Sequence, residues 1–110
     1  MSTVEELRGE ESKIEEALKE NQRRKEELNA SLGELRRALE EVRDKLYKTR
    51  DYGEAGRLER SMIGISNRMG PVENELSEID KRIKGLETSL KQVRSRLEDL
   101  ARSRGGGWLV

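Results

Sequence analysis

The sequence is informative first for the residue types that it lacks. It contains no cysteine, no histidine and no phenylalanine, and aromatic residues make up 3% of its 110 residues. Without cysteine it forms no disulfide and no thiolate metal site, and without histidine it lacks the commonest general base and zinc ligand. So few large apolar side chains do not fill a globular core, but they suffice for a narrow interface between helices.

An excess of charge of one sign is also missing. The 23 basic and 23 acidic residues cancel, and they are interspersed along the chain. A nucleic-acid-binding protein usually carries a basic excess or a basic stripe, so nucleic acid is disfavoured as a partner. Because no stretch resembles a signal peptide or a membrane span, we expect a soluble cytoplasmic protein with no membrane partner.

Enzymatic activity is not expected from this inventory of residues. The sequence offers no phosphate-binding glycine loop and no hydrophobic pocket that would desolvate a catalytic carboxylate. We therefore expect no catalytic residue, no cofactor and no metal site, and we interpret the many glutamates and aspartates as a solvated helical surface.

The chain does contain a long seven-residue repeat of apolar residues, which stand alternately three and four positions apart. The first run comprises Val4, Leu7, Ile14, Leu18, Leu28, Leu32, Leu35, Leu39, Val42 and Leu46. The second comprises Leu58, Met62, Ile65, Met69, Val72, Leu76, Ile79, Ile83, Leu86, Leu90, Val93, Leu97 and Leu100. A repeat sustained this long, with 42% charged residues, predicts helices that supercoil through a narrow seam of a and d positions.

The interruption between the two runs predicts a chain reversal. Asp51 is a good N-cap, and Glu54 follows it at the position whose carboxylate can reach back to the cap amide. We expect a first helix over about residues 3–49, opened by Ser2 or Thr3, a turn at about 49–51 and a second helix over about 52–103. The short connection favours an antiparallel arrangement.

The predicted fold is therefore all-α: a long antiparallel coiled-coil helical hairpin over residues 1–104. Folding near residue 52 joins an a position to a d position in every layer, for example Leu46 with Leu58. Extended parallel helices are the alternative. Gly70 and Pro71 interrupt the second helix, and proline there predicts a kink or a helix that restarts with Pro71 in its first turn.

Three layers of the predicted seam are polar. Asn21 and Lys25 stand opposite Ile83 and Ile79, and Glu11 occupies a third layer. One interpretation is that these polar residues fix the register of the two helices. The other is that Ile79 and Ile83 lack full cover and bind a second chain. On that interpretation Asn21, Lys25, Ile79 and Ile83 form an oligomer seam, and the hairpin dimerises into a four-helix bundle.

Charges beside the seam favour a second chain in the same way. The register places Arg8 opposite Arg94 and Glu15 opposite Glu87. Such like-charge pairs are mildly unfavourable when they are exposed. A homodimer would offer these residues better partners.

The turn region, residues 51–62, resembles the UVR motif, a short helical hairpin of excision-repair proteins and of Clp-type ATPases and their regulators. The matching residues are Asp51, Tyr52, Ala55, Gly56 and Leu58. The two residues after Leu58 depart from the family order, because the acidic one precedes the basic one. The resemblance implies docking of a protein partner through the tip, with Asp51, Tyr52 and Glu54 as binding residues. Alternatively, a capping residue and an aromatic wedge serve only the turn.

The acidic tip also resembles the transcript-cleavage factors that enter the secondary channel of RNA polymerase and help to hold magnesium. That resemblance implies that Asp51 and Glu54 would enter the polymerase channel and help to hold magnesium there. Those factors carry a globular second domain, which we do not expect these 110 residues to form. Helix capping accounts for the same two carboxylates.

The C-terminal residues 105–110 are expected to form a flexible glycine tether that carries Trp108, Leu109 and Val110. A hydrophobic tail with a free carboxylate resembles the chain ends that PDZ-type domains capture, and the glycine-tethered termini of proteasome activators. A tail folded back onto the bundle, or an engineered or truncated terminus, would explain it equally.

Together these patterns predict a non-enzymatic coiled-coil scaffold or adaptor that binds protein partners of unknown identity through its tip and its tail. The alternative is a regulator of a large machine. It would dock on a protease or proteasome through the tail, or act on RNA polymerase through the acidic tip.

Overall fold

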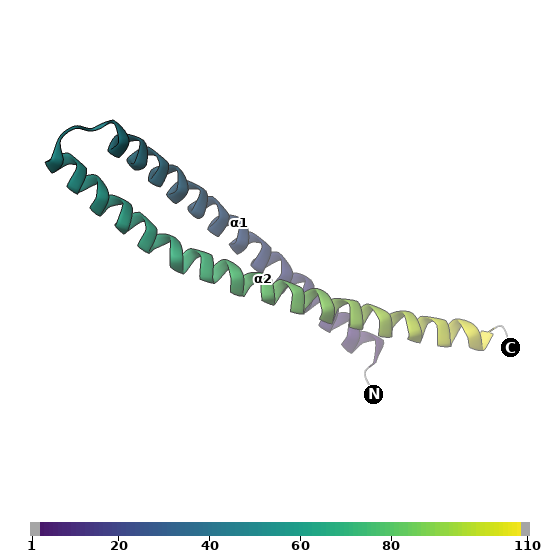
Figure 1. Ribbon diagram of the computed structural model, residues 1–110. Helices are drawn as coiled ribbons and strands as arrows, with labels where there is room; N and C mark the ends of the chain where they lie inside the picture. The colour runs from purple at the N-terminus through teal and green to yellow at the C-terminus, as the bar shows by residue number, and fades with distance from the viewer. Residues whose placement is uncertain (1–2, 109–110) are drawn as a thin grey trace. The chain divides into compact units, whose positions relative to one another are not determined.

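The computed structural model describes the backbone of residues 3–108 and the side chains of residues 3–103. It contains two long helices, α1 (Val4–Lys48) and α2 (Tyr52–Trp108), and no strand among the described residues. All the described residues are helical except residue 3 and residues 49–51. Figure 1 shows α1 and α2 joined by the short connection at residues 49–51. The prediction of an all-α fold is confirmed.

The first turn of α1 is capped by the residue that precedes it. The hydroxyl of Thr3 accepts a hydrogen bond from the backbone N–H of Glu6 at 3.1 Å, and the carbonyl of Thr3 accepts one from Leu7 at 3.0 Å. Thr3 is thus the N-cap of α1. The other candidate, Ser2, lies outside the described residues.

The contacts divide the chain into two compact units. Unit 1 comprises Met1–Arg23 and Asp80–Val110, and unit 2 comprises Arg24–Ile79. In unit 2 the end of α1 and the start of α2 form a helical hairpin around the turn, and Arg24 of α1 contacts Glu75 of α2 at 3.1 Å. In unit 1 the start of α1 contacts the end of α2, where Glu11 lies 3.1 Å from Arg94. The helices are antiparallel in both units, so the alternative of extended parallel helices is wrong.

The seam lies at the positions that the repeat predicts. Every a and d residue from Val4 to Leu46 and from Leu58 to Leu100 is buried or half-buried. Among the described side chains, the buried residues are Leu7, Leu28, Leu32, Ile79, Ile83, Leu90 and Val93. Burial of these apolar side chains holds the two helices together.

Burial within unit 2 is uneven along the hairpin. Leu28, Leu32 and Ile79, at the end remote from the turn, are 4%, 5% and 2% exposed. From residue 33 to residue 78 the seam residues are only half-buried. Apolar surface therefore stays open to solvent near the turn.

The second helix is longer than the sequence predicts. It passes through Pro71 as one uninterrupted helix, so the predicted restart at Pro71 is wrong. It also continues beyond residue 103 through the three glycines to Trp108, where the sequence predicts a flexible tether. Glycine accepts helical dihedral angles without steric cost, and no described glycine takes the positive φ that commonly ends a helix. Leu109 and Val110 lie outside the described residues.

Within the described part of the chain, neither helix has a stretch that is long and apolar enough to cross a bilayer.

Candidate protein-binding site at the turn

The turn between α1 and α2 is held by a compact set of hydrogen bonds. The backbone N–H of Thr49 donates to the carbonyl of Lys45 at 2.9 Å, which closes the last turn of α1. The N–H of Asp51 donates to the hydroxyl of Thr49 at 3.3 Å. The carboxylate of Asp51 accepts the N–H of Gly53 at 2.9 Å, and its carbonyl accepts the N–H of Ala55 at the same distance. The predicted N-cap at Asp51 is confirmed.

Glu54 contributes to the turn in a different way from the predicted one. Its carboxylate accepts a hydrogen bond from the hydroxyl of Thr49 at 3.1 Å instead of reaching back to the cap amide. The Thr49 hydroxyl therefore accepts from one side of the turn and donates to the other. Asp51 and Glu54 both have a structural partner inside the turn.

Removing the cap is expected to destabilise the start of α2. Asp51→Ala leaves the N–H of Gly53 without its side-chain acceptor, and the loss of such a cap costs about 1 kcal/mol. Asp51→Asn keeps an acceptor oxygen and is the matched control. Urea unfolding followed by circular dichroism measures both. Equal stability of Asp51→Ala and the original chain would contradict the capping role.

Both tyrosines of the chain lie beside this turn and point into solvent. Tyr52, the first residue of α2, is 95% exposed, and Tyr47, in the last turn of α1, is 83% exposed. The alternative interpretation of Tyr52 as an aromatic wedge inside the turn is therefore wrong. Tyr47 was missed, although the repeat contains its signal: it follows Leu46 of the seam and so falls at an outward position.

The surface beside Tyr52 is slightly hollowed. Thr49, Arg50, Asp51, Tyr52 and Ala55 line this open depression. It combines an aromatic ring, a guanidinium and a carboxylate within a few residues. Such a mixture suits the docking of a protein segment better than the enclosure of a small molecule, which needs a deeper pocket.

The four residues of the predicted oligomer seam are divided between the units. In unit 2, Ile79 is 2% exposed and Lys25 is half-buried; in unit 1, Ile83 is 8% exposed and Asn21 is half-buried. Both isoleucines are covered within the single chain, so the prediction that they lack cover is wrong. The methylene groups of a half-buried lysine can cover apolar surface while its ammonium stays in water.

Asn21 satisfies its polar group within its own helix. Its side-chain amide donates a hydrogen bond of 2.7 Å to the carbonyl of Ala17, one turn earlier. A seam residue bonded in this way requires no polar partner on α2 or on a second chain. Register control by the polar layers stays a prediction, because this hydrogen bond lies within α1 and does not join the two helices.

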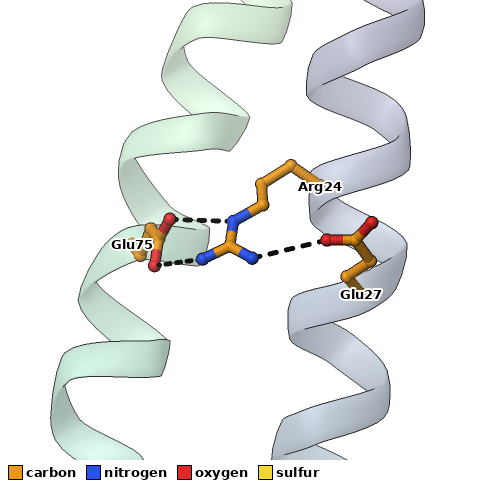
Figure 2. A network of polar contacts seen from close by, with 3 residues as sticks. All are labelled: Arg24, Glu27 and Glu75. Atoms are coloured by element: carbon orange, nitrogen blue, oxygen red, sulfur yellow. Dashed lines mark hydrogen bonds and ion pairs between the residues drawn. The ribbon is translucent and has the colours of Figure 1, made fainter.

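Arg24 links the two helices of unit 2. Figure 2 shows its guanidinium between Glu75 of α2 and Glu27 of α1, and the two Glu75 oxygens accept at 3.1 and 3.3 Å. The hydrogen bonds with Glu75, with a smaller contribution from Glu27, raise the pKa of Arg24 above its ordinary value. These side chains are about half exposed, so the bridge fixes the register more than it stabilises the fold.

Arg94 plays the corresponding part in unit 1. It lies 3.1 Å from Glu11 and 3.0 Å from Glu15, and the hydrogen bond with Glu11 is the main reason that its pKa is raised. The prediction that Arg94 faces the like charge of Arg8 is thus wrong, because Arg94 pairs with two glutamates of α1. A long arginine side chain reaches past the residue directly opposite to a carboxylate farther along the helix. Glu11, a polar seam residue, is thereby paired.

The remaining predicted site residues lie at the C-terminus. Trp108 is the last residue of α2, and only its backbone is described. Its side chain, Leu109 and Val110 lie outside the described side chains. Docking through the tail therefore stays a prediction. Among the described residues, no group of three acidic, histidine or cysteine side chains is placed to hold a metal ion.

Comparison with known proteins gives the chain no relative. No protein-family model matches it, and neither a curated protein nor a solved structure is significantly similar to it.

Proposed function

We propose that the protein is a non-enzymatic coiled-coil scaffold or adaptor that binds a protein partner through its turn. The observation that supports this most is the exposure of Tyr47 and Tyr52, which are 83% and 95% exposed. Tyrosine is enriched among the residues that dominate binding energy at interfaces, because it combines a large rigid apolar ring with a hydrogen-bonding hydroxyl. The two tyrosines of the sequence both stand next to the turn, Tyr47 at the end of α1 and Tyr52 at the start of α2.

The turn also has the rigidity that a binding site needs. Asp51, Thr49 and Glu54 are joined by hydrogen bonds of 2.9 to 3.3 Å that hold the backbone between the tyrosines. A surface that is ordered before binding loses less conformational entropy when the partner arrives. The resemblance of residues 51–62 to the UVR motif supports the same use of the tip. In this proposal Asp51 and Glu54 act mainly by shaping the turn, while Tyr52 and Tyr47 contact the partner.

Two further elements complete the proposal. Trp108, Leu109 and Val110 provide a second, hydrophobic docking end, and the chain self-associates as a homodimer. The alternative regulator of RNA polymerase would use the carboxylates of Asp51 and Glu54 directly. The hydrogen bonds that both carboxylates already make within the turn favour the adaptor over this alternative.

A photo-crosslinking amino acid at position 52 tests the proposal in the cells that produce the protein. We expect a discrete adduct with a partner protein from position 52 and none from position 19, an exposed control site on α1. In the same chain, Tyr47→Ala should lower the yield of the adduct roughly tenfold, the effect of removing a strong interface residue. Circular dichroism should show unchanged helicity.

Two results would contradict the adaptor function at the tip. One is an equal adduct pattern from positions 52 and 19. The other is an adduct that is unaffected by Tyr47→Ala but lost in the double variant Asp51→Asn with Glu54→Gln, which would support the acidic-tip alternative instead.

A further inference from the structure

One stretch of α2 has a surface unlike the rest of the chain. Residues 61–72 contain a single charged residue, Arg68, whereas 42% of the whole chain is charged. The heptad positions that point away from α1 on this stretch are Ile63, Gly64, Asn67, Gly70 and Pro71. Ile63 is 60% exposed, which makes it the one strongly exposed large aliphatic residue among the described side chains. We call these five residues the outward face of α2.

Packing within the chain does not account for the composition of this face. A Cβ atom added at Gly64 or Gly70 would meet nothing within 4 Å, and neither glycine has a positive φ. Both glycines and Pro71 weaken a helix relative to alanine. Pro71 also has no N–H, so the backbone carbonyl of Asn67 lacks its usual helical donor. Residues that cost helix stability, and that no tight packing within the chain requires, point to a role outside the chain.

The charges that flank the outward face are arranged with opposite signs at its two ends. Arg57, Glu59 and Arg60 precede the face and carry a net positive charge, and the acidic residues Glu73, Glu75 and Glu78 follow it; all six are exposed. When two such segments pair antiparallel, the net basic end of each meets the acidic end of the other. A parallel arrangement would place like charges together. The sequence of charges is therefore complementary to an antiparallel copy of itself.

We propose that residues 57–78 of α2 bind the same segment of a second copy of the chain, antiparallel, around a two-fold axis at Asn67. In this register Ile63 lies against Pro71 of the second copy, and Gly64 lies against Gly70 of the second copy. The glycines let the two backbones approach closely, and Arg60 reaches Glu73 of the second copy. An uncharged centre with a charged rim is the usual anatomy of a specific interface.

This arrangement is isologous, so every contact is made twice and the assembly closes as a dimer. It also brings the Asn67 side-chain amide of each copy near the open Asn67 carbonyl of the other. The inference rests on the proposed self-association but names a different surface from the heptad seam, whose isoleucines Ile79 and Ile83 are already buried. It is independent of the tyrosines at the turn.

Light scattering and sedimentation equilibrium of the full chain provide the first test. We expect a dimeric mass for the original chain. Asn67→Lys places two like charges at the axis and should raise the dimer dissociation constant roughly tenfold or more. Asn29→Lys, the same change at an exposed site on α1, should leave it unchanged. Arg60→Glu should weaken the dimer, and the charge swap Arg60→Glu with Glu73→Arg should restore it.

The absence of native cysteine allows a second, geometric test. A residue on a two-fold axis meets its own copy, so Asn67→Cys should form a disulfide-linked dimer under mild oxidation, whereas Asn29→Cys should not. A monomeric mass for the original chain overturns the proposal. So does a dimer that crosslinks through Asn29→Cys as readily as through Asn67→Cys. Tyr47→Ala should not change the mass, so failure of this inference and failure of the adaptor function are distinguishable.

Discussion

Ile79→Ala is expected to lower the free energy of unfolding by about 2–5 kcal/mol, the usual cost of emptying a buried aliphatic site. The side chain of Ile79 is 2% exposed, which places it with Leu7 among the two most completely buried large side chains described. A domain of this kind is stable by only about 5–15 kcal/mol, so the loss is a large fraction of the total. Chemical unfolding followed by circular dichroism measures it.

Ile65→Ala is the matched control for this prediction. It makes the same change at a seam position of the same helix and the same unit, but Ile65 is only half-buried. It should cost about half as much or less, because less apolar surface leaves water when the helix packs. An equal or larger loss at Ile65 would contradict the burial gradient of unit 2.

Pro71→Ala is expected to raise the free energy of unfolding by up to about 3 kcal/mol, the difference between proline and alanine in a helix interior. Pro71 lies within an uninterrupted α2 and is exposed, so alanine restores the missing hydrogen bond to the Asn67 carbonyl without disturbing the seam. Unfolding is measured at a protein concentration at which the chain is monomeric, which removes any contribution from association.

Pro71→Gly provides the control for that change. Glycine also restores the N–H, but it should gain about 1 kcal/mol less than alanine because its unfolded state is more flexible. A neutral effect of both substitutions would mean that α2 restarts at Pro71 in solution, since proline in the first turn of a helix costs little.

Much of the fold follows from the sequence because a heptad repeat has one period and one seam. The repeat placed every seam residue on the covered side of its helix, and the capping residue Asp51 marked the start of α2. These features depend on neighbours three or four positions away, which the sequence displays directly.

The errors arose where long side chains or helix ends decide the result. The burial of Ile79 and Ile83 depends on how the surrounding side chains pack, and the partner of Arg94 depends on the reach of its guanidinium. Neither follows from heptad positions. The end of α2 was misplaced because three glycines permit a helix as well as a tether. The exposure of Tyr52 depends on a rotamer at a helix start, where the repeat gives no direction.

The uneven burial of unit 2 has a consequence for the order in which the hairpin assembles. Contacts beside the turn close short loops at little entropic cost. They also gain little free energy, because the seam residues there are only half-buried. Burial of the cluster of Leu28, Leu32 and Ile79 contributes more free energy to association. The residues of this cluster are far apart in the sequence, because they lie at the end of the unit 2 hairpin remote from the turn. Closing that larger loop costs only slightly more, because the entropy grows with the logarithm of its length. The contacts that commit the hairpin to its folded state are therefore the ones at the end farthest from the turn, and not the ones that close the shortest loops.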